Sequence, residues 1–263
     1  MTIKKNDDFL KQEFMWVNFL VNVKAHFSEK FLTQERRCIY HFIAASSLVQ
    51  LHDDLDFATT LNKGHAICDS RIIEILSRVC GVKIQRIRGA DFFRLFFTKI
   101  TVTKKHLFVG STPQVMKSLI ANINLISRNH QEIHFICPEF DVQMDTQIRE
   151  IVKEFTARDF DYIWIAMGSP KQDYMAHAIS ADFDGSIFCI GAAVDFVSGH
   201  KSEAPYFFQF IGIEWLYRFA QEPRRLFIRY TFGNIRFISL YCKWVFRVRL
   251  SKGGALEVRD DVA

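Results

Sequence analysis

The stretch that decides the fold is Tyr162-Ile-Trp-Ile-Ala-Met-Gly-Ser-Pro-Lys-Gln-Asp-Tyr-Met-Ala-His177. Its first six residues, Tyr162–Met167, are apolar and rich in β-formers, which predicts a strand buried on both faces. Residues 168–170, Gly-Ser-Pro, then end the strand, and the proline suits the first turn of a helix that holds Lys171 and Gln172. Such a turn places backbone N–H groups at the carboxyl edge of a sheet, where α/β proteins bind ligands, often phosphates.

This turn has two interpretations. In the functional one, Gly168 allows close backbone approach, while Lys171 and Gln172 hold uridine or phosphate. In the other, the segment is an ordinary strand-to-helix turn with a solvated lysine. The local pattern does not separate the two.

Strands and helices alternate along most of the chain. The other predicted strands are Cys38–Ala45, His65–Cys68, Lys83–Arg88, His106–Val109, Glu132–Cys137 and Ser186–Ile190. The predicted helices are Ser46–Leu61, Arg71–Val79, Asp91–Ile100, Gln114–Ser127, Met144–Ala157 and Pro170–Ile179. The alternation predicts an α/β fold with a parallel sheet and helices on both faces. Residues 9–35 contain neither Pro nor Gly and fit a helix, or a helix leading into a strand.

Composition sets the broad class. A chain of 263 residues, 49% of them apolar, makes one large domain or two small ones. The six cysteines have no Cys-x-x-Cys spacing and fit buried free thiols in a reducing compartment. The first 30 residues have no cleavable-signal pattern, and apolar stretches such as Phe14–Val23 are too short to span a bilayer. We therefore expect a cytoplasmic protein, soluble or bound at a membrane surface.

Positive charge is concentrated near the C-terminus. Residues 215–252 contain nine Lys or Arg residues and one acid, Glu222, so this segment has a net charge of +8. The whole chain has a net charge of +5, so the remaining residues have a net charge of −3. The strand–helix alternation also stops here. We therefore predict an α/β catalytic domain over residues 1–204 and a basic helical appendage over 205–263, with helices Pro205–Ala220 and Pro223–Val248.

Apolar residues are interleaved with these cations. They are Phe227, Ile228, Phe232, Phe237, Ile238, Tyr241, Trp244, Val245 and Phe246. Apolar and basic faces on one helix are typical of binding to an anionic membrane surface. A core helix of a homo-oligomer is an alternative. A nucleic-acid-binding face is disfavoured, because such a module would carry basic charge on its folded body, which here is acidic.

Three motifs carry a family resemblance. They are Met167-Gly-Ser-Pro-Lys-Gln-Asp173; Gly191-Ala-Ala-Val-Asp-Phe196 with Gly199 and Ala204-Pro205; and Gly212-Ile-Glu-Trp-Leu-Tyr-Arg218 with Glu222-Pro-Arg-Arg225 and Arg229-Tyr230. In this order and spacing they resemble the motifs of the WecG/TagA/CpsF family of bacterial glycosyltransferases. The resemblance covers roughly residues 42–230 and implies a Rossmann-like fold.

The resemblance also implies a reaction. Such enzymes transfer a sugar, commonly N-acetylmannosamine or a relative such as a uronic acid derivative, from a UDP-sugar to a polyprenyl-diphosphate-linked acceptor. They work at the inner face of the cytoplasmic membrane, and their products feed capsule, exopolysaccharide, enterobacterial common antigen or wall teichoic acid. The resemblance implies inversion at the anomeric carbon without a metal or other cofactor. Its proposed base aligns with Asp69, and its tail arginines complete the site against the diphosphates.

Three positions depart from the family pattern. Ala44 stands where the family has Asn, Ser70 follows the proposed base where the family has Gly, and Glu203 replaces the Arg of Arg-Ala-Pro. Ala44 and Glu203 keep a rival function open, a catalytically weak nucleotide-sugar-binding protein of the same fold. A Rossmann oxidoreductase is disfavoured, because no Gly-x-Gly-x-x-Gly follows an early strand.

The residue types fit this chemistry. One carboxylate, Asp69, suffices as general base for inverting transfer, although Asp is also a common N-cap and could cap the helix Arg71–Val79. Arginines pair well with the diphosphate of the leaving group. Arg218, Arg225 and Arg229 are spaced seven and four residues apart, so a continuous helix would place them on one face. Their alternative role is a solvated or lipid-facing basic stripe.

Further residues line the predicted pocket. Asp195 could contact sugar hydroxyls, and Gly191 permits close backbone approach. Gly110 and Ser111 could form another wall of the nucleotide site, or a plain turn. Three Asp-x-Asp pairs, at 54/56, 159/161 and 182/184, match a pattern that can bind Mg²⁺ or Mn²⁺. We predict surface charge for all three, because two precede strands at the amino edge of the sheet and the first lies in a helical stretch.

Overall fold

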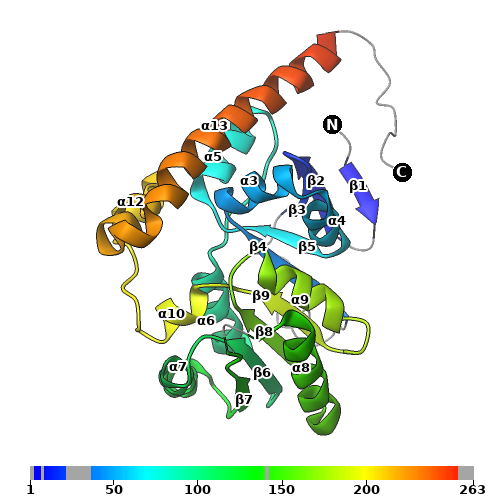
Figure 1. The fold of residues 1–263 in the computed structure, drawn as a ribbon, viewed down its shortest axis with the longest axis vertical. Coiled ribbons are helices and arrows are strands. Elements are labelled where there is room, and N and C mark those ends of the chain that lie inside the picture. Colours follow the sequence, from blue (N-terminus) through cyan, green and yellow to red (C-terminus); the bar gives the residue numbers. More distant parts are fainter. Residues whose placement is uncertain (1–2, 7–8, 22–36, 140–141, 254–263) are drawn as a thin grey trace.

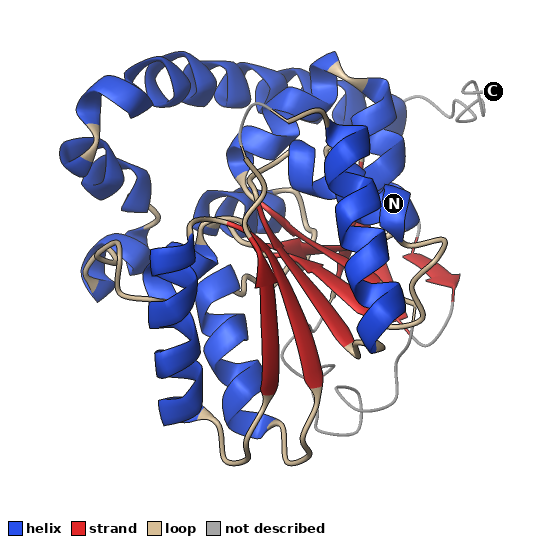
Figure 2. Cartoon of the chain, turned by 60° about the horizontal axis from the view of Figure 1, so that its bottom comes forward, coloured by secondary structure: helices blue, strands red, loops and turns tan. Residues whose placement is uncertain are grey.

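The computed structural model is built on one nine-stranded sheet (Figures 1 and 2). It describes residues 3–6, 9–21, 37–139 and 142–253, without the side chains of 3–6, 9–11, 225–226, 228–231 and 249–253. The strands are β1 (Ile3–Asn6), β2 (Phe9–Phe14), β3 (Val17–Leu20), β4 (Ile39–Ile43), β5 (His65–Cys68), β6 (Lys105–Gly110), β7 (Glu132–Ile136), β8 (Tyr162–Ala166) and β9 (Ser186–Cys189). Their order across the sheet is β1-β2-β3-β5-β4-β9-β8-β6-β7.

From β3 to β7 every neighbouring pair is parallel. This confirms the predicted α/β fold with a mostly parallel sheet. From β4 the chain passes to β5 on one side, while β9, β8, β6 and β7 lie on the other side. The topological switch point therefore falls between β4 and β9, which is where open α/β sheets bind ligands, outside the carboxyl ends of the strands.

Helices cover both faces of the sheet (Figure 2). They are α3 (Ala45–Asp53), α4 (Leu55–Lys63), α5 (Arg71–Val79), α6 (Gly89–Lys99), α7 (Pro113–Ile126), α8 (Met144–Arg158), α9 (Lys171–Ile179), α10 (Ala193–Val197), α11 (Tyr206–Ile211), α12 (Glu214–Gln221) and α13 (Pro223–Gly253). One face packs against α6, α7 and α10. The other packs against α8 and α9 beside the central strands, and against α3, α4, α5 and α13 beyond them.

The first face has an aromatic core that accounts for part of the phenylalanine content. Trp164 of β8 is fully buried and its ring centroid lies 4.9 Å from Phe96 and 5.2 Å from Phe93, both on α6. Its indole Nε1 donates to Nδ1 of His106, whose pKa is lowered to about 4 by burial. A neutral His106 can accept this hydrogen bond, so its role is structural.

The N-terminal segment differs from its prediction. A helix was predicted within residues 9–35, but β2 and β3 form an antiparallel meander with β1 and extend the sheet beside β5; residues 22–36 lie outside the described part. The predicted strand Lys83–Arg88 was also wrong, because only Arg86 makes an isolated bridge, to Cys68.

The C-terminal helices confirm the predicted helical tail, and α13 packs against the body. Figure 1 shows α13, in orange to red, running along one side of the molecule over α3 and α5. Phe237, Leu240 and Trp244 of α13 are buried in the core cluster beneath it, and the Tyr241 hydroxyl donates to the carbonyl of Leu76 on α5. None of the helices in the described ranges combines the length and apolar character needed to cross a bilayer.

Candidate active site at the carboxyl edge of the sheet

Parallel strands bring the predicted site residues to one edge. Asp69 follows β5, Gly168 follows β8 and Gly191 follows β9, while Gly110 ends β6 and Ser111 follows it. All are therefore at the carboxyl edge, on strands that are neighbours or near neighbours. We call this edge the rim.

The Asp69 carboxylate is held at the rim by the backbone. Its Oδ1 accepts a hydrogen bond from the N–H of Gly89, the first residue of α6, at 3.0 Å. The predicted alternative, capping of α5, is not what the carboxylate does, because Ser70 is the N-cap residue there. Among the described residues no hydrogen bond reaches its other oxygen, Oδ2. Oδ1 thus fixes the position of the carboxylate, and Oδ2 can accept a proton or a hydrogen bond from a ligand.

Gly89, which donates to Asp69, lies close to the end of β9. A methyl group at Gly89 would lie 3.3 Å from Cβ of Ala193 and 3.4 Å from the carbonyl oxygen of Ile190. A methyl group at Gly191 would lie 3.6 Å from Oε1 of Gln172. Gly89, which holds Asp69, therefore lies next to the end of β9, and Gly191 lies next to Gln172.

Gln172 fastens two strand ends together. Its side chain is buried; Oε1 accepts from the N–H of Gly168 at 3.1 Å, and Nε2 donates to the carbonyl of Cys189 at 3.2 Å. Both ends of the amide are thus occupied by backbone, which gives Gln172 a positioning role at the turn. A direct contact of Gln172 or Lys171 with a ligand stays a prediction.

The end of β6 is a close backbone approach. Gly110 has φ +114°, and a Cβ there would lie 2.6 Å from the carbonyl oxygen of Ala166 on β8, so only glycine fits. Ser111, which follows it, has φ +58°. This geometry accounts for both residues structurally, and their contact with a nucleotide stays a prediction.

Asp195 lies in α10, where the sequence did not anticipate its partner. Lys201 Nζ is 3.3 Å from Asp195 Oδ2 and 3.2 Å from Glu222 Oε1, so one cation joins α10 to the end of α12. Lys201 lies between α10 and α11, and its sequence position carried no signal of this pairing.

The predicted arginines are only partly described. The Arg218 guanidinium lies 4.7 Å from the ring centroid of Phe196, the neighbour of Asp195, and 3.8 Å from Oε2 of Glu214. This cation–π contact holds α12 over α10. The side chains of Arg225 and Arg229 lie outside the described part of the structure, although both residues belong to α13.

A network of ion pairs that the sequence did not reveal joins the rim to α11 and α12. Arg86 donates to the carbonyl of Asp69 at 3.1 Å and to that of Gln209 at 3.1 Å, and pairs with Glu214. Arg88 is buried and pairs with Glu203 at 2.6 Å, Gln209 Oε1 at 2.7 Å and Glu214 at 3.6 Å. Arg86 therefore links the backbone of Asp69, the candidate base, to α11 and α12 of the tail.

Glu203, which departs from the family pattern, is charge-compensated. It pairs with Arg88 and Arg94. Burial alone would raise the pKa of Glu203, but hydrogen bonds from Arg94 and Arg88 lower it. Ala44 is the N-cap of α3 and leaves that helix without a side-chain cap.

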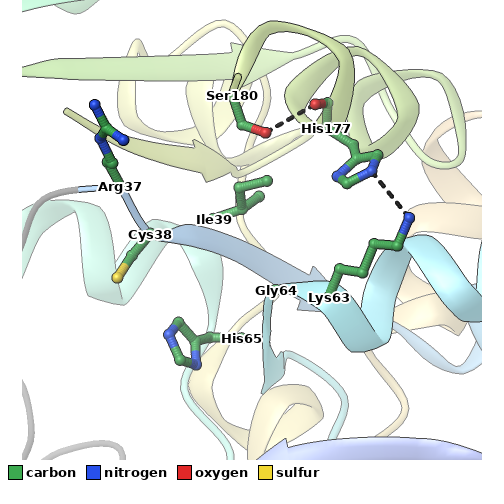
Figure 3. Close-up of a pocket in the computed structure, with 8 residues that line it drawn as sticks. All are labelled: Arg37, Cys38, Ile39, Lys63, Gly64, His65, His177 and Ser180. Atoms are coloured by element: carbon green, nitrogen blue, oxygen red, sulfur yellow. Dashed lines mark hydrogen bonds between the residues drawn. The ribbon is translucent and has the colours of Figure 1, made fainter. Parts of the chain in front are cut away.

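A hollow elsewhere in the fold does not belong to this site. About 180 Å³ in volume, it is lined by Arg37, Cys38, Ile39, Lys63, Gly64, His65, His177 and Ser180. Figure 3 shows these side chains, with Lys63 bonded to His177 and Ser180 to the carbonyl of His177. Ile39 and His65 begin β4 and β5, so the hollow is at the amino edge, opposite Asp69.

The Asp-x-Asp pairs have structural partners. Asp54 caps α4 by accepting from the N–H of Phe57 and also accepts from the Tyr174 hydroxyl. Asp161 pairs with Lys104 at 2.7 Å, and Asp184 pairs with Arg37. Each pair thus has one carboxylate with a partner inside the protein; the surface-charge interpretation stays a prediction.

A parallel α/β sheet with a carboxylate, cations and close-approaching glycines at its carboxyl edge defines a Rossmann-like ligand-binding enzyme fold. The model of the glycosyl transferase WecG/TagA/CpsF family matches residues 20–251. The chain belongs to this family, as its motifs predicted, and is a glycosyltransferase of polysaccharide biosynthesis. Membership implies a nucleotide-sugar donor and a lipid-linked acceptor in general terms.

Proposed function

We propose that this glycosyltransferase moves a hexose, N-acetylmannosamine or a relative, from a UDP-sugar to a polyprenyl-diphosphate-linked acceptor, with inversion and without a metal. The observation that carries the proposal is Asp69, held at the rim through one oxygen by Gly89 with the other oxygen available. In this proposal residues 1–204 are the catalytic domain and 205–263 the appendage that completes the site.

The proposed step needs one base and one stabilised leaving group. Asp69 takes the proton of the acceptor hydroxyl as that oxygen bonds to the anomeric carbon. The bond from that carbon to the β-phosphate oxygen breaks, and its electron pair leaves with UDP. Negative charge grows on the β-phosphate, so cations beside Asp195 stabilise the transition state. Arg218, which lies over Phe196, and Lys201, which pairs with Asp195, are our candidates for this role, and Arg225 and Arg229 are assigned the same role from the motif.

The rival function is a binding protein with little turnover. Its basis was the loss of an arginine at Glu203 and of an asparagine at Ala44. Glu203 forms ion pairs with Arg88 and Arg94, so its charge reversal is balanced within the fold. This favours an intact site with altered donor recognition.

A panel of UDP-sugars tests the function. We expect the protein, given UDP-N-acetylmannosamine and related donors with a short polyprenyl-diphosphate sugar, to release UDP only when the acceptor is present. UDP release from none of the donors, with binding intact, would favour the rival function. The same assay in EDTA tests the metal proposal: full activity is expected, and a loss that Mn²⁺ restores would contradict it.

Membrane attachment at the inner face is proposed from the tail's exposed surface. Of the predicted membrane-facing residues, Phe237 and Trp244 were wrongly assigned, because they are buried against the body. Among the described side chains of α11, α12 and α13, the large apolar ones that are exposed are Tyr206, Phe207, Phe210, Ile211, Trp215, Leu216, Phe227, Phe232, Ile235, Ile238 and Phe246. Apolar surface of this extent, interleaved with basic residues, supports docking on an anionic bilayer.

Substituting exposed residues tests this attachment without opening the core. The double variant Phe232→Ser/Ile235→Ser is expected to bind anionic liposomes at least roughly tenfold more weakly. The reason is that complete burial of one large apolar side chain in the bilayer contributes about 1.5–3 kcal/mol. Sedimentation with vesicles would measure this binding, and Leu125→Ser, at an exposed apolar residue of α7, is the control. Unchanged vesicle binding, together with a shift from oligomer to monomer, would assign the face to a homo-oligomer.

A further inference from the structure

A chain of three side chains runs from the sheet core to the rim. Asp173, in the first turn of α9, is fully buried. Its Oδ1 is 2.7 Å from Nδ1 of His41 on β4, and its Oδ2 is 2.6 Å from the hydroxyl of Ser169. Ser169 is partly exposed in the turn after β8. The buried carboxylate therefore determines how the serine at the surface is oriented.

The direction of both hydrogen bonds follows from the carboxylate. An ionised carboxylate only accepts, so Nδ1 of His41 carries its hydrogen and Ser169 donates its own. A Cβ at Gly64 would lie 2.6 Å from Nε2 of His41, so this glycine closes over the far side of the ring. With its hydrogen committed inward, the Ser169 oxygen faces the rim as an acceptor.

Four backbone N–H groups of the same turn already donate within the protein. The N–H of Gln172 donates to the carbonyl of Gly168, and the N–H groups of Asp173 and Tyr174 donate to that of Pro170. The N–H of Gly168 donates to Gln172 Oε1. Four N–H groups are thus occupied within the protein, and the Asp173 carboxylate adds negative charge beneath them. These four groups are therefore not available to bind a phosphate.

The position of the turn along the sheet selects the part of the donor. Asp69 follows β5 and Ser169 follows β8, three strands away in the order β5-β4-β9-β8. At about 4.8 Å per strand this is roughly 14 Å. In the proposed function the anomeric carbon lies at Asp69 and the diphosphate lies beside Lys201 and Arg218, which contact α10 after β9. The end of β8 is then left for the nucleoside end of the donor.

We propose that Ser169 recognises the nucleoside of the donor, accepting a hydrogen bond from an N–H or O–H group of the uracil or ribose. This inference rests on the proposed function and names the part of the donor bound at this turn. Asp173 and His41 are positioning residues that fix the polarity of the Ser169 hydroxyl.

A metal interpretation of the same cluster is weaker. His41, Asp173 and Cys189 lie close enough together to share an ion. However, Nδ1 of His41 and Oδ1 of Asp173 are already at hydrogen-bond distance, and Cys189 Sγ faces the carbonyl of Gln172 at 3.6 Å. Burial raises the pKa of the Cys189 thiol, which disfavours the thiolate that a metal requires.

Calorimetric titration of UDP and its analogues tests the inference. Ser169→Ala is expected to weaken UDP binding roughly two- to tenfold, the contribution of one neutral hydrogen bond, and to leave inhibition by pyrophosphate unchanged. The analogue arms are 3-methyl-UDP, which lacks the uracil N–H, and 2′-deoxy-UDP and 3′-deoxy-UDP, which each lack one ribose hydroxyl. The analogue lacking the true partner should bind wild type more weakly but show no further loss in Ser169→Ala.

A second variant changes polarity instead of removing the oxygen. In Asp173→Asn the amide N–H₂ can donate to Ser169, which turns the serine hydrogen toward the ligand, so UDP binding should weaken at least as much as in Ser169→Ala. The controls are Ser180→Ala, whose hydroxyl bonds within α9, and Asp54→Asn, whose carboxylate accepts from a hydroxyl of the same helix. Thermal unfolding of each variant accompanies the titrations.

Three outcomes count against the inference. Equal UDP affinity in wild type and Ser169→Ala would overturn it alone. Equal losses for UDP and pyrophosphate would assign the hydroxyl to the diphosphate and also overturn it. Failure of wild type to bind UDP would overturn the proposed donor and this inference together.

Discussion

Replacing Asp69 with asparagine is expected to lower kcat for sugar transfer by about 10²- to 10⁴-fold, the usual contribution of a general base. The amide oxygen of asparagine can still accept the hydrogen bond from Gly89, so the turn should keep its conformation. UDP affinity should therefore change little. Steady-state UDP release and calorimetric UDP binding, made on one preparation, would measure both quantities.

Asp182→Asn is the matched control for this substitution. Asp182 is exposed and lies near the amino edge of the sheet, so the same chemical change is made away from the rim. Transfer by Asp69→Asn within a few fold of wild type would remove Asp69 from the role of base. A parallel fall in kcat and in UDP affinity would assign Asp69 to donor binding.

Replacing Arg218 with alanine is expected to lower kcat by about 10²- to 10³-fold, the loss seen when one preorganised donor to a developing charge is removed. The charge on the β-phosphate grows as the bond breaks, so KM for the UDP-sugar should rise much less than kcat falls. Arg218→Lys should recover part of the rate, because it keeps the charge but not the paired N–H groups.

Arg224→Ala is the control for Arg218→Ala. Arg224 is exposed in the first turn of α13. Because Arg218 also contacts Phe196 and Glu214, thermal unfolding must be measured beside the kinetics. A variant that unfolds at lower temperature, yet transfers at the wild-type rate when folded, would reduce Arg218 to an anchor of α12.

Much of the fold could be predicted because local signals agreed. The helix predicted at Arg71–Val79 is α5 with the same ends, and the strand predicted from Tyr162 is β8, one residue shorter. Strand–helix alternation with short turns then left few arrangements besides a parallel sheet. The motif resemblance was confirmed by the family match over residues 20–251.

The N-terminal meander could not be predicted because its turn lacks the usual residues. Met15 and Trp16 connect β2 to β3 with φ +46° and +69°. Hairpin turns with two positive φ values usually use Asn or Gly, whose absence made a helix the natural interpretation. Burial of Phe14, Met15 and Val17 against the body supplies the stabilisation that local propensity lacks.

At the site, the sequence found residues that follow strands but missed those that act across long separations. Asp69, Gly168 and Gly191 were predictable because a parallel sheet collects its strand ends. Arg88, which reaches Glu203 over 115 residues, and Lys201, which joins α10 to α12, have no local pattern.

The packing of α13 against the body also constrains the orientation of the enzyme on a bilayer. This helix has 31 residues, about 46 Å at 1.5 Å per residue, and lies along α3, which begins at Ala45 beside the switch point. If α13 binds the bilayer, it would therefore fix the distance between the active site and the lipid headgroups and the tilt of the enzyme relative to them. The enzyme would then prefer acceptors whose sugar lies at that distance from the headgroups, before it recognises any hydroxyl group.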